Sequence, residues 1–215
     1  MKNKINLKLS VTAFLLLILW TALVLFIDVK EIGPENSKVG LSSLNGFFHG
    51  LTGVNFSLYL ITDWLSLIPV FIVLGFGVFG LAQLIKRKSI KKVDFDILVL
   101  GVFYMVTFSF YILFEFVKIN FRPILIDGVL ETSYPSSTTM LVLCVMSTLI
   151  TEIDFRIKNL KIKKMLKILT VTFILFMVIG RMISGVHWLS DIIAGVLLSL
   201  GLIFLYKHFI EKVNV

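Results

Sequence analysis

The chain has 215 residues, of which 58% are hydrophobic and 16% are charged, and its mean hydropathy is +0.99. Soluble domains carry about a quarter charged residues, so this composition excludes an ordinary water-soluble globular protein. The net charge of +8 would suit a nucleic-acid partner, but the positions of the basic residues along the chain give it another meaning.

Long apolar blocks without period-two alternation predict helices that cross a bilayer rather than the strands of a barrel. A helix needs about 20 residues to cross roughly 30 Å of hydrocarbon. The Lys-rich start lacks a small-residue cleavage site after its apolar stretch, so we predict an uncleaved first span and not a signal peptide. In chain order, the predicted spans are Leu9–Ile27, Trp64–Ile85, Ile97–Phe116, Pro135–Thr151, Met165–Ile183 and His187–Tyr206.

The stretch Ser42–Tyr59 is also apolar, but Gly46, Gly50 and Gly53 interrupt it. We predict it as an interfacial or re-entrant segment and not as a seventh span. No internal repeat, linker or soluble domain is visible, so residues 1–215 are expected to form a single membrane domain. The predicted fold class is all-α: a polytopic membrane protein with six transmembrane helices in one bundle and a short interfacial segment after the first.

The basic residues predict the orientation of this bundle. With six spans, both termini and the loops near 86–96 and 152–167 share one side, and most of the 21 Lys and Arg residues lie there. The other side has only Lys30, Lys38, Lys118, Arg122 and Arg181. The positive-inside rule therefore places both termini in the cytoplasm. The charge excess is thereby explained as a topology signal, and we expect no nucleic-acid partner.

Three polar clusters interrupt the apolar pattern on the predicted outer side, all at one membrane depth. They are Lys118–Pro123, Tyr134–Thr139 and Arg181–Asp191. Taken alone, each has a structural interpretation: an interfacial anchor for an Arg, a helix N-cap for the Pro-Ser-Ser-Thr run, and a hydrogen-bonded pair for His187 and Asp191. Ionisable groups so close to hydrocarbon are costly, and their occurrence together indicates a functional site.

The chemistry that these side chains suit is phosphoryl transfer. On a helix, a four-residue spacing would place the Asp191 carboxylate beneath the His187 imidazole. Such a carboxylate fixes the tautomer and leaves the other ring nitrogen free to attack phosphorus. Arg122 and Arg181 offer forked donors to phosphate oxygens, and the backbone N–H groups after Ser136 would form an anion site at a helix N-terminus.

The sequence offers no sign of a nucleotide, metal or other cofactor site. It contains no Gly-rich phosphate loop. His49, His187 and His208 are not at the spacings of metal ligands. We therefore expect catalysis without a metal or a cofactor.

These residues resemble the signature of the type-2 phosphatidic acid phosphatase superfamily. That signature consists of Lys, six residues and Arg-Pro; then Pro-Ser-Gly-His; then Ser-Arg, five residues, His, three residues and Asp. The matching positions here are Arg122-Pro123, Pro135-Ser136, Arg181, His187 and Asp191. The resemblance covers most of the chain from the third span onward.

The resemblance implies a six-helix membrane fold and a metal-independent phosphatase. His187 would be the nucleophile that forms a phosphohistidine, and Asp191 would orient it. Arg122, Arg181 and Ser136 would hold the phosphate. The substrate would be a membrane lipid phosphate or diphosphate in the surrounding bilayer.

Three positions depart from the family signature. The signature Lys is replaced by Glu115, and Lys118, about one helical turn further on, is our candidate for its phosphate-binding role. The Ser before Arg181 is Gly180. The second-part His, which in the family is the general acid, is Thr138. Auxiliary candidates for the site are therefore Glu115, Thr138, the neighbouring Ser137, and His49 as a substitute proton donor.

The loss of the general acid predicts which substrates this chain prefers. Protonation of an alkoxide leaving group is worth about 10²–10⁴ in rate, whereas phosphate leaving from a diphosphate is already stable as an anion. We therefore expect a hydrolase that favours prenyl diphosphates such as undecaprenyl diphosphate, acting at the outer face of a bacterial cytoplasmic membrane. The alternatives are a non-catalytic lipid-phosphate-binding or transport relative and a lipid phosphotransferase. The oligomeric state is not predicted.

Overall fold

The computed structural model describes residues 2–211 of the chain, and the side chains of residues 4–211. Met1 and residues 212–215 lie outside this part, and with them Lys212, one of the basic residues on the predicted cytoplasmic side. The helices are α1 (Lys2–Phe26), α2 (Ser42–Thr52), α3 (Phe56–Leu65), α4 (Leu67–Arg87), α5 (Phe95–Phe116), α6 (Ser137–Arg156), α7 (Leu160–Ile183) and α8 (Leu189–Ile210). Two 3₁₀ turns (Pro34–Asn36 and Ile90–Lys92) and a two-stranded hairpin of β1 (Lys30–Glu31) and β2 (Lys38–Val39) complete the structure.

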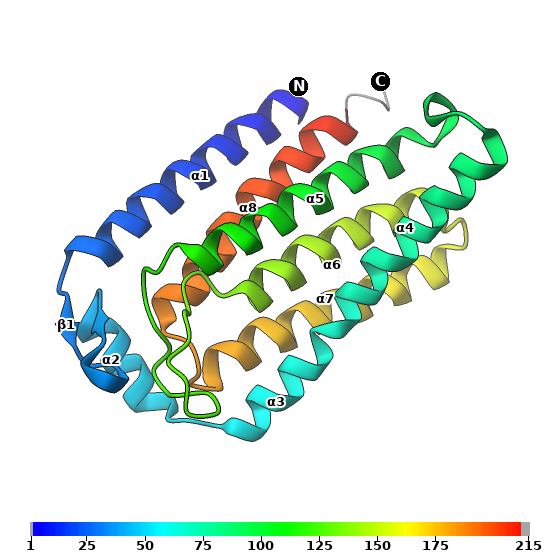
Figure 1. Ribbon diagram of the computed structural model, residues 1–215. Helices are drawn as coiled ribbons and strands as arrows, with labels where there is room; N and C mark the ends of the chain where they lie inside the picture. Colours follow the sequence, from blue (N-terminus) through cyan, green and yellow to red (C-terminus); the bar gives the residue numbers. More distant parts are fainter. Residues whose placement is uncertain (1, 212–215) are drawn as a thin grey trace.

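Within residues 2–211, six helical stretches are long and apolar enough to cross a bilayer, which confirms the predicted all-α membrane bundle. They run side by side in one bundle, with α2 and the β-hairpin at one end (Figure 1). The second stretch, Phe56–Arg87, joins α3 and α4 and begins earlier than predicted. The side chain of Asn55 accepts a hydrogen bond from the Leu58 amide and so starts a helix within the segment that we had assigned to the interface. The interfacial segment is therefore the shorter helix α2.

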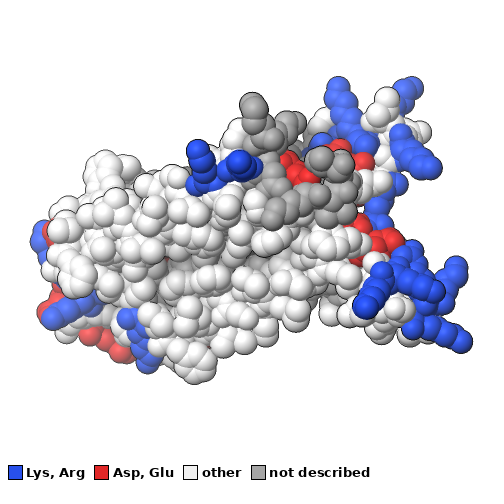
Figure 2. All heavy atoms as spheres, turned by 90° about the horizontal axis from the view of Figure 1, so that it is seen from above, with Lys and Arg blue, Asp and Glu red and all other residues white. Residues whose placement is uncertain are grey.

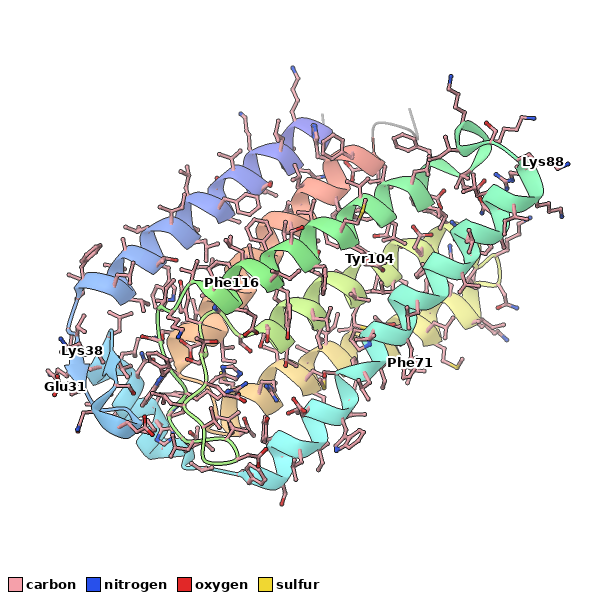
Figure 3. The ribbon with its side chains drawn as sticks, viewed as in Figure 1. Glu31, Lys38, Phe71, Lys88, Tyr104 and Phe116 are labelled. Carbon is pink, nitrogen blue, oxygen red and sulfur yellow. The ribbon has the colours of Figure 1, made fainter. Side chains whose placement is uncertain are left out.

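The outer surface of the bundle is made of large apolar side chains. Phe71 is 67% exposed and Phe116 is 79% exposed, and both are labelled on the outside of the bundle in Figure 3. Such a continuous apolar surface would be unfavourable in water but is the natural surface of a helix bundle in lipid. The chain is therefore an integral membrane protein.

Helices α6 and α8 form the buried centre of the bundle, and α1 packs along α8 (Figure 1). Small residues let these helices approach closely. A Cβ at Gly195 would lie 2.9 Å from the Ser136 carbonyl oxygen of α6, and one at Gly201 would lie 2.8 Å from the ring of Phe14 on α1. Close packing of this kind is the main source of stability between helices in a membrane. It also ties the start of α6 directly to α8, whose first turn carries Asp191.

Charged side chains gather at the two ends of the bundle, with a broad uncharged band between them (Figure 2). Lys88 lies at the end that holds both termini, whereas Glu31 and Lys38 lie at the opposite end (Figure 3). At the terminal end, Arg156 donates to Glu152 at 2.8 Å and to Asp96, and so links α5 to α6. Lys and Arg therefore gather mainly at the end that holds both termini, as the positive-inside rule requires of a cytoplasmic end.

At the end opposite the termini, α2 packs against α8, and the β-hairpin lies close to α1. Gly40, next to β2, lies so close to α1 that a Cβ would be 1.5 Å from the Val24 carbonyl oxygen. Only glycine fits there, because the clash would be with backbone and not with a movable side chain. Asn45 of α2 then reaches Ser190 at the first turn of α8, with its Nδ2 3.0 Å from the serine Oγ.

We predict that Gly40→Ala lowers the free energy of unfolding by about 1–3 kcal/mol, because the added methyl group pushes the hairpin away from α1. Thermal unfolding of detergent-purified protein, followed by tryptophan fluorescence, measures the change. Gly50→Ala is the matched control, since nothing lies within 4 Å of a Cβ at Gly50 in α2. Equal melting temperatures for the two variants would contradict the prediction.

Candidate active site

Three segments that are distant in sequence meet at the end of the bundle opposite the termini. The loop between α5 and α6 folds back on itself through a bridge between Phe121 and Thr132, and it carries Arg122. The end of α7 carries Arg181, which is 1% exposed. The turn between α7 and α8 carries His187, which is 4% exposed. The structure therefore brings together the three residues that the sequence motifs singled out.

The imidazole of His187 is held between the two arginines. Nη1 of Arg122 and Nη2 of Arg181 each lie 3.3 Å from its Nε2. Guanidinium nitrogens only donate hydrogen bonds, so Nε2 must accept and must carry the lone pair. The ring proton then lies on Nδ1. The nitrogen with the free electron pair is thus the one that faces the arginines.

Asp191 lies behind the imidazole, in the first turn of α8. Its Oδ2 accepts a hydrogen bond from the Trp188 amide at 3.0 Å and lies 3.9 Å from Nδ1 of His187. The four-residue spacing suggested a pair along one helix, but His187 precedes α8, which begins at Leu189. The carboxylate therefore approaches the ring from the helix N-terminus. Nδ1 makes no bond of strict hydrogen-bond geometry, and the Ser133 backbone is a further polar neighbour of this imidazole.

Arg181 and Arg122 have guanidinium nitrogens that make no hydrogen bond within the protein. Nε and Nη1 of Arg181 are buried and make no hydrogen bond, although Nη1 lies 3.6 Å from Asp63. Nε of Arg122 lies 2.9 Å from Glu131 without hydrogen-bond geometry. Buried guanidinium groups with unused donors are costly unless an anion completes them. Their forked donors suit a phosphate group.

Helix α3 contributes two residues to the site that sequence reasoning missed. The guanidinium carbon of Arg181 lies 5.0 Å from the centre of the Tyr59 ring, and that of Arg122 lies 5.9 Å from it. Asp63, one turn further along α3, faces Arg181. Tyr59 thus forms a shared platform under both cations. Tyr59 lies in an apolar stretch and belongs to no motif, so no sequence signal indicated this role.

The departure at Gly180 has a structural explanation in the packing of α3. A Cβ at Gly180 would lie 2.8 Å from Cγ2 of Thr62, so the glycine allows α3 to lie directly against α7. Tyr59 and Thr62 are on the same face of α3, one turn apart. The small residue that replaces serine in the motif therefore brings the platform to the arginines.

The start of α6 forms another side of the site. Ser136 is the N-cap, fully buried, and its Oγ accepts hydrogen bonds from the amide and the hydroxyl of Thr139. The backbone N–H groups in the first turn of a helix have no acceptor within the helix, and they favour anions. Ser137 and Thr138 line the cavity, whereas Ser136 lies behind them.

Two further candidates lie away from the arginines. Lys118 is exposed and does not line the cavity, whereas Glu115, at the position of the signature Lys, does. Nε2 of His49 is 3.2 Å from the Gly185 carbonyl oxygen, and its ring packs against Trp188 with a centroid distance of 5.4 Å. His49 therefore supports the turn that precedes α8.

A cavity of about 930 Å³ opens from the arginines into the bundle between α4, α5 and α6. Its polar end contains Arg122, Arg181 and His187, and its walls continue along apolar side chains such as Val73 and Val145. Tyr104 lies at its inner part, roughly 18 Å along α5 from the outer end of that helix. A hydrocarbon chain attached to a phosphate group fits such a space.

The cavity lining also includes three carboxylates, from Asp63, Glu115 and Glu131. Sequence reasoning had considered only Glu115. Glu131 faces Arg122 across the short hairpin of the α5–α6 loop, where the Arg122 amide donates to the Glu131 carbonyl at 3.0 Å. Within the described residues, no three His, Cys, Asp or Glu side chains come together as a metal site requires.

Comparison with known proteins agrees with this architecture. The sequence profile of the PAP2 superfamily matches residues 99–214. A solved structure described as the first transmembrane PAP2 type phosphatidylglycerolphosphate phosphatase, from Bacillus subtilis, superposes with a TM-score of 0.61. The match covers 95% of this chain and 97% of that chain at 22% sequence identity, and at this identity it shows the fold alone. No curated protein sequence matches significantly.

Burial and the adjacent Arg122 and Arg181 hold the pKa of His187 well below its usual value near 6.5. In the unfolded chain this imidazole takes up a proton as the pH falls through about 6.5, whereas in the folded protein it stays neutral. We therefore predict that His187 makes the free energy of unfolding fall with decreasing pH below about 6.5, by at most about 1.4 kcal/mol per pH unit.

The measurement compares thermal unfolding of the wild type and His187→Asn between about pH 7.5 and pH 5. The two curves should diverge below about pH 6.5, with the wild type losing more stability. Curves that stay parallel would mean that the folded imidazole titrates like an exposed one. Because the same comparison cancels the contributions of His49 and His208, the difference belongs to His187.

Proposed function

Since the chain belongs to the PAP2 superfamily and has a transmembrane phosphatase fold, we propose that it hydrolyses lipid-linked phosphate or diphosphate through His187. The observation that carries this proposal is the lone pair of Nε2, which faces the buried guanidinium of Arg181 and the half-buried one of Arg122, both with nitrogens that make no hydrogen bond. A nucleophile and an anion site thus share one position. Asp63, Glu115 and Glu131 leave the lining without the excess of positive charge that a purely electrostatic anion trap would have.

The proposed reaction has two steps. In the first, Nε2 of His187 attacks phosphorus, the bond from phosphorus to the leaving oxygen breaks, and that oxygen keeps the electron pair. Arg122 and Arg181 stabilise the charge on the transferring group, and Asp191 stabilises the imidazolium that forms. In the second step, water attacks the phosphohistidine and releases inorganic phosphate together with a neutral imidazole.

The preferred substrate in this proposal is a prenyl diphosphate. Thr138 lines the cavity at the position where the signature has its general-acid histidine, and a hydroxyl group cannot protonate an alkoxide efficiently. When the terminal phosphate of a diphosphate is transferred, the leaving group is a lipid monophosphate, which is stable as an anion. The apolar walls of the cavity suit the hydrocarbon chain.

The proposed site faces the outside of a bacterial cytoplasmic membrane, with both termini in the cytoplasm. The support is the concentration of Lys and Arg at the end of the bundle that holds the termini. A phosphotransferase would use the same first step and differ only in the acceptor, which would be an alcohol in place of water.

Phosphate release from undecaprenyl diphosphate and from phosphatidate, by detergent-purified protein, tests the proposal. We expect His187→Ala to abolish release, and the diphosphate to have a kcat/KM about 10²–10⁴ higher than the monoester, because only the monoester requires the missing acid. His208→Ala, at the opposite end of the bundle, is the matched control. A monoester that is hydrolysed faster would contradict the substrate preference, and activity in His187→Ala would contradict the nucleophile.

Labelling of introduced cysteines tests the orientation. In a Cys144→Ser background, we expect Val129→Cys, in the α5–α6 loop, to react with a membrane-impermeant maleimide in intact cells. Lys91→Cys, in the α4–α5 loop, should react only after the cells are lysed. Val129 is 59% exposed and Lys91 is also exposed, so access and not burial decides the result. The reverse pattern would place the site in the cytoplasm.

A further inference from the structure

A buried polar cluster lies behind Asp191, on the side away from the cavity. It consists of Asn45 from α2, Asn120 from the α5–α6 loop and Ser190 from α8, which are all 1% exposed or less. None of the three lines the cavity. Buried polar side chains are costly unless they are fully hydrogen-bonded, so three of them at one place call for a specific explanation.

Two of the three residues bond directly to the carboxylate of Asp191. Nδ2 of Asn120 lies 3.2 Å from Oδ1 of Asp191, and the hydroxyl of Ser190 donates to the same oxygen at 3.3 Å. The other oxygen, Oδ2, accepts from the Trp188 amide and faces His187. The carboxylate is therefore held at both oxygens, and Oδ2 is the one that faces the imidazole.

Asn45 does not contact Asp191 itself but holds Ser190, which does. Its Nδ2 donates to Ser190 Oγ at 3.0 Å and to the Gly40 carbonyl at 2.7 Å, while its Oδ1 accepts from the Ser190 amide at 3.0 Å. With Asn45 and Asn120 both donating to it, Ser190 Oγ has its acceptor capacity filled. Its own proton must then point to Asp191.

We propose that Asn120 and Asn45 are positioning residues for the nucleophile, acting through Asp191. They hold the Asp191 carboxylate as an acceptor facing Nδ1 of His187, and this keeps the ring proton on Nδ1 and the lone pair on Nε2. The inference rests on the proposed reaction at His187. It also gives α2 a function, although α2 lies outside the region 99–214 that the family profile covers.

The sharpest test is Asn120→Asp, which keeps the shape of the side chain and removes its donor group. Near pH 7.5, the introduced carboxylate faces that of Asp191, and like charges at this distance repel. We expect kcat to fall by about ten- to hundredfold while KM changes less than about twofold. Because a shared proton restores a donor, the loss relative to wild type should shrink when the pH is lowered to about 5.5.

Other ionisable groups near this carboxylate pair are His187, Tyr134 and, across Trp188, His49. They are the same in wild type and variant, so the ratio of the two pH profiles isolates the introduced group. A purely structural role for Asn120 would give a variant whose profile runs parallel to that of the wild type. That result would overturn the inference.

Asn45→Ala tests the contact of Asn45 with Ser190, through which Asn45 acts on Asp191. It should lower kcat with KM nearly unchanged, whereas Asn159→Ala should leave both unchanged. Asn159 is a matched control because its side chain caps α7 at the other end of the bundle and touches none of the site. Equal kcat values for the two variants, at equal folded fractions by tryptophan fluorescence, would overturn the inference.

A readout independent of turnover separates this inference from the proposed function. In ¹⁵N-histidine-labelled protein, with the His187 signals assigned by their loss in His187→Ala, the wild type should show the Nδ1–H tautomer. Asn120→Asp near pH 7.5 should perturb it. If no lipid is hydrolysed but the tautomer responds in this way, the proposed function fails and the positioning role stands. An unchanged tautomer would overturn the positioning role whatever the activity.

Discussion

Arg122 and Arg181 both contact one imidazole nitrogen, and the surrounding residues must stabilise these two neighbouring cations. Arg122 and Arg181 repel each other at this distance, and burial makes the repulsion stronger. A tyrosine ring lies beneath both guanidinium groups, and a carboxylate lies beside each, which offsets this repulsion. Several guanidinium nitrogens still make no hydrogen bond, so the site has donors left for the oxygens of a bound anion. An anion with forked acceptors completes it.

Helix packing in the bundle serves this arrangement. The glycine at position 180 admits α3, which brings Tyr59 to the arginines, and Gly195 lets α8 meet the start of α6. Gly40 lets the β-hairpin lie on α1. The Gly40 carbonyl also accepts a hydrogen bond from the Asn45 side chain. In a membrane, where apolar side chains gain little by leaving lipid, such backbone contacts decide which helices touch.

Hydropathy and spacing predicted much of this molecule. The six spans, the family and the meeting of Arg122, Arg181 and His187 followed from apolar blocks and motif spacing, which are local signals. Tyr59 and Asn45 could not be found in this way, because each is an ordinary residue in an apolar segment and gains its role only from contacts with distant elements. The second span was predicted to begin at Trp64 because Ser42–Tyr59 was assigned as one interfacial segment, whereas Asn55 within it caps α3.

The three carboxylates in the cavity lining change how a substrate reaches the arginines. Asp63, Glu115 and Glu131 offset the charge of Arg122 and Arg181, so little net field extends beyond the cavity. Long-range steering of an anion from solution is therefore weak, and ionic strength has little influence on encounter. Arrival then depends on diffusion of the lipid within its leaflet. A site of this kind favours anchored phosphates over soluble ones through access, before any difference in chemistry.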